Sequence, residues 1–161
     1  MCPQQDYFTP AVIKNQLEGV IKMKKELKKA QKEYMVAKAA HEAALAIEEE
    51  AKTNVLRDNV FHNEETGERI TSTTADFLMS DSEFFQYCEL VHAEMLRMGL
   101  DIPAENTADY KTRPALMAAE NKLIDISIAI SPVKIRQGLE TARNNLKYRQ
   151  EMIDLTLRLA L

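Results

Sequence analysis

This chain of 161 residues is 45% hydrophobic and 29% charged, which is typical of a folded globular protein and excludes wholesale disorder. It has only 4 glycines and 5 prolines and lacks tryptophan, so long helices are favoured over a loop-rich β-sandwich. No run approaches the roughly 18 apolar residues of a membrane span. The N-terminus does not resemble a signal peptide, and two cysteines make no disulfide framework. We therefore expect a cytoplasmic protein that does not cross a membrane.

Charge is strongly segregated along the chain. The net charge of −4 combines about +5 over residues 10–38, −12 over residues 42–109 and +4 over residues 110–161. The chain is therefore basic toward both ends and acidic in the middle. Such stretches are either solvated helix faces or surfaces that bind a partner of opposite charge.

The longest predicted element is a helix over residues 10–57. Thr9 and Pro10 match an N-cap followed by proline at the first helical position. The following residues are mostly Ala, Lys, Glu, Leu, Gln and Met, the strongest helix formers. Opposite charges four residues apart add stability. These pairs are Glu18 with Lys22, Lys22 with Glu26, Lys29 with Glu33 and Glu48 with Lys52.

The apolar residues of this helix repeat as a heptad. The central positions of the seam are Leu27, Ala30, Tyr34, Ala37, His41 and Ala44. Its N-terminal continuation is Ile13, Gln16, Val20 and Met23, and its C-terminal continuation is Glu48, Ala51 and Val55. Small residues on a seam allow close approach of a second helix. Because a lone helix of this length is not stable, the seam predicts a partner helix in the same chain or in another copy. The length of the seam leads us to expect a homodimer or higher oligomer.

A β-hairpin is predicted over residues 60–72. Gly67 lies in a polar loop and can adopt the left-handed conformation that a bulged hairpin turn requires. Because two strands alone are marginally stable, we expect Phe61 and Ile70 to pack against a helix.

A second helix is predicted over residues 81–98. Ser80 and Glu83 form the pattern of a capping box, and Gly99 followed by Leu100 is typical of a Schellman C-cap. The predicted apolar stripe of this helix comprises Phe84, Tyr87, Cys88, Leu90, Val91 and Met95.

Two further helices are predicted over residues 114–130 and 132–160, after a loop over residues 101–113. Pro114 opens the first of them, and Ser131 followed by Pro132 separates the two. The sequence thus predicts a single, mostly helical domain over residues 1–161. It would be an elongated antiparallel helical hairpin or coiled-coil bundle with a small β-hairpin insertion.

No motif in the chain carries a reaction. Cys88 and His92 are four residues apart, but two ligands do not make a zinc site. Glu89 and His92 form one Glu-x-x-His motif, whereas a di-iron bundle needs two. We therefore expect no catalytic residue, no metal and no cofactor.

A dense group of lysines is the clearest candidate for binding. It comprises Lys22, Lys24, Lys25, Lys28, Lys29 and Lys32. Neutralising several phosphates at once would give salt-sensitive binding to nucleic acid. Four residues near the C-terminus could join them if the ends of the chain pair: Arg136, Arg143, Lys147 and Arg149.

Residues 65–71, followed by residues 77–81, resemble segments of small bacteriophage and mobile-element proteins. This resemblance implies an accessory role and carries over no functional residue. The leading hypothesis is a non-enzymatic assembly or interaction protein that acts by helix–helix contacts with itself or a protein partner. The alternative hypothesis is a nucleic-acid-binding accessory protein that uses the lysines of the first helix.

Overall fold

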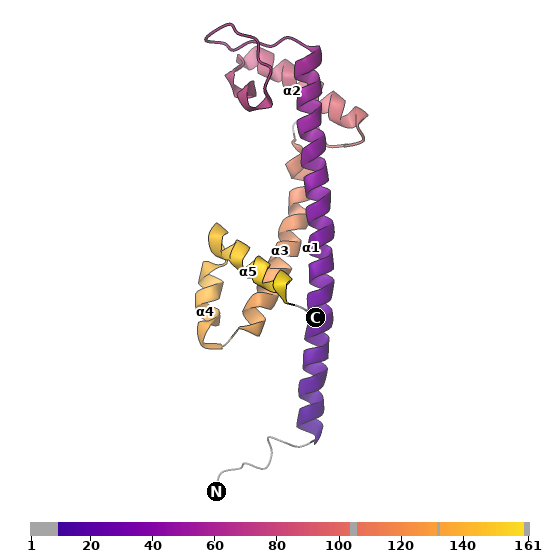
Figure 1. Cartoon of the computed structure of the whole chain (residues 1–161), viewed down its shortest axis with the longest axis vertical. Coiled ribbons are helices and arrows are strands. Elements are labelled where there is room, and N and C mark those ends of the chain that lie inside the picture. Colours follow the sequence, from indigo (N-terminus) through magenta and orange to yellow (C-terminus); the bar gives the residue numbers. More distant parts are fainter. Residues whose placement is uncertain (1–9, 104–105, 132, 160–161) are drawn as a thin grey trace. The chain divides into compact units, whose positions relative to one another are not determined.

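The computed structural model describes residues 10–103, 106–131 and 133–159, without the side chains of residues 11–17 and 20. The described residues form five α-helices and one 3₁₀ helix, with no strand among them (Figure 1). The elements are α1 (Pro10–Asp58), η1 (Thr73–Leu78), α2 (Asp81–Arg97), α3 (Ala108–Ile130), α4 (Val133–Ala142) and α5 (Leu146–Arg158). The prediction of a mostly helical protein is confirmed.

The first helix, α1, has 49 residues and ends one residue beyond the predicted boundary. Two of the predicted ion pairs form along it: Lys29 to Glu33 at 3.9 Å and Lys52 to Glu48 at 3.2 Å. Such pairs on a helix surface each contribute only a few tenths of a kcal/mol, so the composition and the buried face hold the helix together.

The segment after α1 forms a turn and not the predicted two-stranded hairpin. A single antiparallel bridge joins His62 and Arg69. Gly67 has a φ of 71°, the left-handed conformation expected of it. Only four residues lie between the end of α1 and Asn63, whose side chain accepts the N–H groups of Glu65 and Thr66. The chain is therefore too short here for a longer ladder.

Both apolar residues of this turn are buried, as predicted. Phe61 is 3% exposed and Ile70 is 4% exposed. The ring of Phe61 meets the ring of Tyr87 edge to face, with 5.6 Å between centroids. Burial of Phe61 against α2, and not strand pairing, thus holds the turn in position.

The caps of α2 follow the sequence signals, with one difference. The Ser80 side chain accepts the N–H of Glu83 at 3.3 Å. The Glu83 carboxylate does not complete a capping box, because it accepts the N–H of His62 at 2.7 Å instead. At the C-terminus, the N–H of Leu100 donates to the carbonyl of Met95 at 2.9 Å, which completes the predicted Schellman motif.

Replacing Ser80 with alanine will lower the free energy of unfolding by about 1 kcal/mol, because the N–H of Glu83 loses its acceptor. Chemical denaturation monitored by circular dichroism measures this change. Ser82→Ala, an exposed position in the same turn, is the matched control and should change stability little. An equal effect of the two substitutions would contradict the cap.

Helix α3 begins six residues earlier than predicted, so residues 108–113 are helical and not part of a loop. Ala108 is fully buried, and its N–H donates to the Glu48 carboxylate at 2.5 Å. This tertiary contact satisfies one N–H of the first turn. Pro114 lies inside the helix, where it is exposed, so water can reach the carbonyl that lost its donor.

The predicted helix over residues 132–160 is two helices. α4 ends at Ala142, and α5 begins after Asn145, whose side chain accepts the N–H groups of Lys147 and Tyr148. Asn caps a helix better than it continues one, and this explains the break. Leu146, the first residue of α5, is 84% exposed.

The helices divide into two compact units. Unit 1 comprises Met1–Val36 and Met117–Leu161, and unit 2 comprises Ala37–Leu116. In unit 1, residues of α1, α3 and α5 supply the buried side chains, whereas α4 supplies none. Figure 1 shows α5 passing beside α3, where Arg149 of α5 donates to Asn121 and Glu120.

The core of unit 2 joins α1, the turn, α2 and the segment that leads into α3. It contains Ala44, Ala51, Val55, Leu56, Phe61, Ile70, Met79, Tyr87, Val91, Met95, Leu100, Ile102 and Ala108. From the predicted α2 stripe, Tyr87, Val91 and Met95 are buried, whereas Phe84, Cys88 and Leu90 are exposed. The alanines of α1 let the other elements approach this helix closely.

Candidate polyanion-binding surface

The predicted lysines of α1 form one exposed surface within unit 1. All six are exposed: Lys22, Lys24, Lys25, Lys28, Lys29 and Lys32. Lys25, Lys28 and Lys32 lie opposite the buried side of the helix, which carries Leu27 and Tyr34, and the other lysines flank them. We refer to the six residues as the lysine face.

Most of the lysine face is not engaged by carboxylates. Lys29 lies 3.9 Å from the Glu33 carboxylate. Within the described part of the chain, no carboxylate lies within ion-pair distance of the other five ammonium groups. Within the described chain, these exposed groups can therefore contact an external anion.

Of the four basic residues near the C-terminus, three are engaged by acceptors within the chain, whereas Lys147 is exposed. Arg136 donates to the carbonyls at the end of α3, and Arg143 pairs with Asp125 at 2.7 Å. Arg149 pairs with Glu120 at 3.4 Å. These three guanidinium groups hold unit 1 together and are already occupied by internal acceptors.

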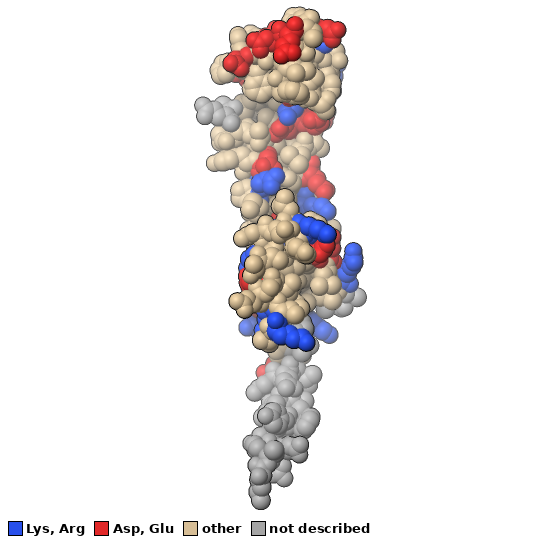
Figure 2. Space-filling view, turned by 90° about the vertical axis from the view of Figure 1, so that its left-hand side faces the viewer, with Lys and Arg blue, Asp and Glu red and all other residues tan. Residues whose placement is uncertain are grey.

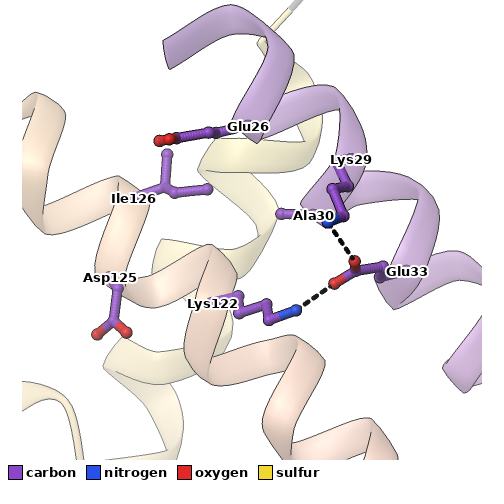
Figure 3. Close-up of a pocket in the computed structure, with 7 residues that line it drawn as sticks. All are labelled: Glu26, Lys29, Ala30, Glu33, Lys122, Asp125 and Ile126. Carbon is purple, nitrogen blue, oxygen red and sulfur yellow. Dashed lines mark hydrogen bonds and ion pairs between the residues drawn. The ribbon is translucent and has the colours of Figure 1, made fainter. Parts of the chain in front are cut away.

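A groove of about 290 Å³ lies beside the lysine face, between α1 and α3. Figure 3 shows the Glu33 carboxylate between the ammonium groups of Lys29 and Lys122. The contact from Lys122 measures 2.5 Å. The hydrogen bond from Lys122, together with the charges of both lysines, holds the pKa of Glu33 below its ordinary value. At neutral pH this carboxylate is ionised and competes with any external anion for the two lysines.

The pairing of Glu33 with Lys122 could not be predicted from sequence spacing. The two residues are 89 positions apart and belong to different helices. The only local signal was the pair of Lys29 and Glu33, which the spacing of four residues did predict.

Replacing Glu33 with glutamine should strengthen binding of a polyanion several-fold, because Lys29 and Lys122 then become available to phosphates. The affinity should also depend more steeply on salt, by about one unit of slope for each added phosphate contact. Fluorescence anisotropy with a labelled oligonucleotide measures both quantities.

Glu26→Gln is the control for this experiment. Glu26 lines the same groove and makes no ion pair within the described residues, so the substitution changes the net charge equally. If the two variants gain the same affinity, the effect is net charge alone and Glu33 is not a competitor.

The predicted oligomer seam faces the chain's own helices. Leu27, Ala30 and Tyr34 are buried in unit 1, and Ala44 is buried in the core of unit 2. Ala37 and His41 are partly buried, and His41 Nδ1 lies 2.8 Å from the Thr112 hydroxyl of α3. The continuation of the seam at Ile13, Gln16 and Val20 lies outside the described side chains. Met23, another position of the seam, is 41% exposed. The buried seam residues from Leu27 to Ala44 thus pack within one chain.

The pair of Cys88 and His92 lacks the features of an activated nucleophile. Burial and, after it, the charge of Asp76 raise the pKa of the Cys88 thiol, which therefore stays protonated at neutral pH. His92 Nε2 lies 2.7 Å from the carbonyl of Ile102, an acceptor for its proton. No group of three or more potential metal ligands occurs among the described residues, and Cys2 lies outside them.

The two units carry opposite charge. Unit 1 holds 14 basic and 9 acidic residues, whereas unit 2 holds 7 basic and 16 acidic residues. Figure 2 shows acidic side chains gathered on the visible face of unit 2, and basic side chains on the described part of unit 1. The pI of about 5.5 for the whole chain is therefore acidic although unit 1 has a net positive charge.

No protein-family model, curated protein or solved structure matches this chain significantly. None of the helices that the structure describes is both long and apolar enough to cross a membrane. Inferences about function therefore depend on the surfaces described above.

Proposed function

We propose that this chain is a non-enzymatic binding protein whose lysine face contacts the phosphates of nucleic acid. The observation that supports the proposal is the exposure of six lysines on one helix, five of them without a carboxylate partner in the described chain. Four residues of the predicted oligomer seam are, by comparison, buried within the chain: Leu27, Ala30, Tyr34 and Ala44. The lysine face thus supports nucleic-acid binding, which was the alternative hypothesis from the sequence.

The size of the lysine face suits a run of phosphates. From Lys22 to Lys32 the helix rises about 15 Å, at 1.5 Å per residue. The same length of duplex carries about nine phosphate charges. Several lysines could therefore act together, and the contacts would be independent of base sequence. Aromatic side chains for base stacking are sparse on this surface, because Tyr34 is buried.

The proposal is tested by fluorescence anisotropy with single- and double-stranded oligonucleotides at several salt concentrations. We expect a dissociation constant on the order of micromolar at low salt. The slope of log K against log salt should be about −3 for duplex, if three or four lysines each neutralise one phosphate. Lack of binding at low salt would overturn the proposal.

A second function is supported by the opposite charges of the two units. We propose it as a self-assembly or protein-interaction role, in which the basic unit binds an acidic protein surface such as unit 2 of another copy. The assembly function and phage-type accessory role expected from the sequence depend on helix–helix contacts, whereas in this role opposite charges provide the contact. Sedimentation velocity without nucleic acid, at low and high salt, distinguishes it: a mass that falls with salt supports assembly, and a monomer at every concentration excludes self-assembly.

A further inference from the structure

Unit 2 contains a cavity of about 210 Å³ that is separate from the lysine face. Its walls come from α1, η1, α2 and the residues that precede α3. A cavity of about 150 Å³ with apolar walls is large enough for benzene. This cavity is thus large enough for one ring with a short substituent.

One side of the cavity is apolar and aromatic. Tyr87, Val91 and Met95 lie on successive turns of α2, and each is at most 5% exposed. The ring of Phe84 lies 6.1 Å from that of Tyr87, tilted by 41°. Phe84 itself is 41% exposed, so an apolar ring stands at the edge of the cavity. These surfaces would pack well against a small hydrophobic body.

One of the two carboxylates at the cavity, that of Asp76, has an oxygen without a hydrogen-bond partner among the described residues. Glu48 is satisfied by Lys52 at 3.2 Å through one oxygen and by the N–H of Ala108 through the other. Asp76 accepts a single hydrogen bond, from the Tyr87 hydroxyl to Oδ2 at 3.3 Å. Its second oxygen has no hydrogen-bond partner among the described residues.

The negative charge of Asp76 acts on two side chains that line the cavity, Tyr87 and Cys88. Burial raises the pKa of Tyr87, and Asp76 raises it further through its charge and its hydrogen bond. The same carboxylate also contributes to the raised pKa of Cys88. Since Glu48 and Lys52 neutralise each other, the lining has a net negative charge. His92 Nε2, also at the cavity, lies 2.7 Å from the Ile102 carbonyl.

We propose that this cavity binds a small organic ammonium ion whose hydrophobic body packs on Tyr87 and Phe84 and whose charge pairs with Asp76. The free carboxylate oxygen accepts the ammonium N–H in a charge-assisted hydrogen bond. The exposed ring of Phe84 adds cation–π attraction when the ammonium group lies over its face. This site is independent of the lysine face, which selects the opposite charge.

The test uses the full chain and three probes of the same shape: benzylamine, benzyl alcohol and benzoate. Amide shifts in ¹⁵N–¹H NMR spectra locate binding and give the affinity. We expect benzylamine to bind about tenfold more tightly than benzyl alcohol, because the hydroxyl of the alcohol can still donate to Asp76 but lacks the positive charge that strengthens this hydrogen bond. Benzoate should bind more weakly than either. Equal or tighter binding of benzoate, or shifts confined to unit 1, would overturn the proposal.

Two pairs of variants sharpen the test. Asp76→Asn should reduce the affinity for benzylamine to that for benzyl alcohol, whereas Asp81→Asn, an exposed acid of α2 outside the cavity, should leave it unchanged. Phe84→Ala should weaken both ligands, and Phe85→Ala, which is 66% exposed and outside the cavity, should weaken neither. Unchanged benzylamine affinity in Asp76→Asn would contradict the assigned counter-ion. Because the three probes act on the unmodified protein, the test holds even if a variant fails to fold.

Discussion

Reversing Lys24, Lys25, Lys28 and Lys29 to glutamate will weaken oligonucleotide binding by about a hundredfold or more. Each substitution removes one cation and adds one anion at the phosphate surface. The four side chains are exposed, so the helical circular-dichroism signal should be retained. Anisotropy at low salt, where the unmodified protein binds most tightly, measures the loss.

A pair of double variants separates the lysine face from net charge. Lys24→Glu with Lys28→Glu changes two positions on the lysine face. Lys134→Glu with Arg158→Glu changes two exposed basic residues of α4 and α5 in the same unit by the same charge. We expect the first pair to weaken binding at least tenfold more than the second. Equal losses would show that the overall charge of unit 1, and not this surface, attracts nucleic acid.

Local sequence signals predicted the parts of the fold that depend on nearby residues. The composition of residues 10–57 predicted α1 to within one residue, because strong helix formers and one buried face act together over its length. Ser80 and Gly99 marked the ends of α2 because capping depends on hydrogen bonds within a few residues. The heptad likewise identified the buried side of α1.

Errors occurred where contacts between distant residues decide the structure. The early start of α3 depends on Glu48, which lies 60 positions before Ala108. The turn at residues 60–72 is held by burial of Phe61 against Tyr87, and this contact needs no ladder. The break after α4 had a local signal in Asn144 and Asn145, which we read as part of a continuous helix.

The candidate sites likewise combine features that local patterns predicted with features that depend on distant residues. Exposure of the lysine face followed from helical periodicity, since the lysines alternate with the buried heptad residues. The competing contact of Glu33 with Lys122 and the cavity around Asp76 did not follow from any spacing. Each of them combines side chains from helices that are far apart in sequence. A pattern within one helix predicts which side is exposed but not which distant residue lies beside it.

Replacing Ala44 with glutamate will destabilise unit 2 by about 3 kcal/mol or more, because it buries a charge without a partner. Ala44 is 4% exposed and belongs to the core of unit 2. A loss of this size is a large part of the roughly 5–15 kcal/mol that stabilises a typical domain. Thermal melting monitored by circular dichroism measures it. Ala43→Glu, at the exposed neighbouring position, should change the melting temperature little.

The same substitution distinguishes the two roles of the heptad seam when mass is measured beside melting. If the seam packs within one chain, Ala44→Glu lowers the melting temperature at every protein concentration and leaves the mass of the folded protein unchanged. If the seam joins two copies, the mass by light scattering falls, and the melting temperature of the unmodified protein rises with concentration. A fall in mass without a fall in intrinsic stability would contradict the packing of Ala44 in unit 2. It would also restore helix–helix assembly as the leading function, because the seam would then be available to a second chain.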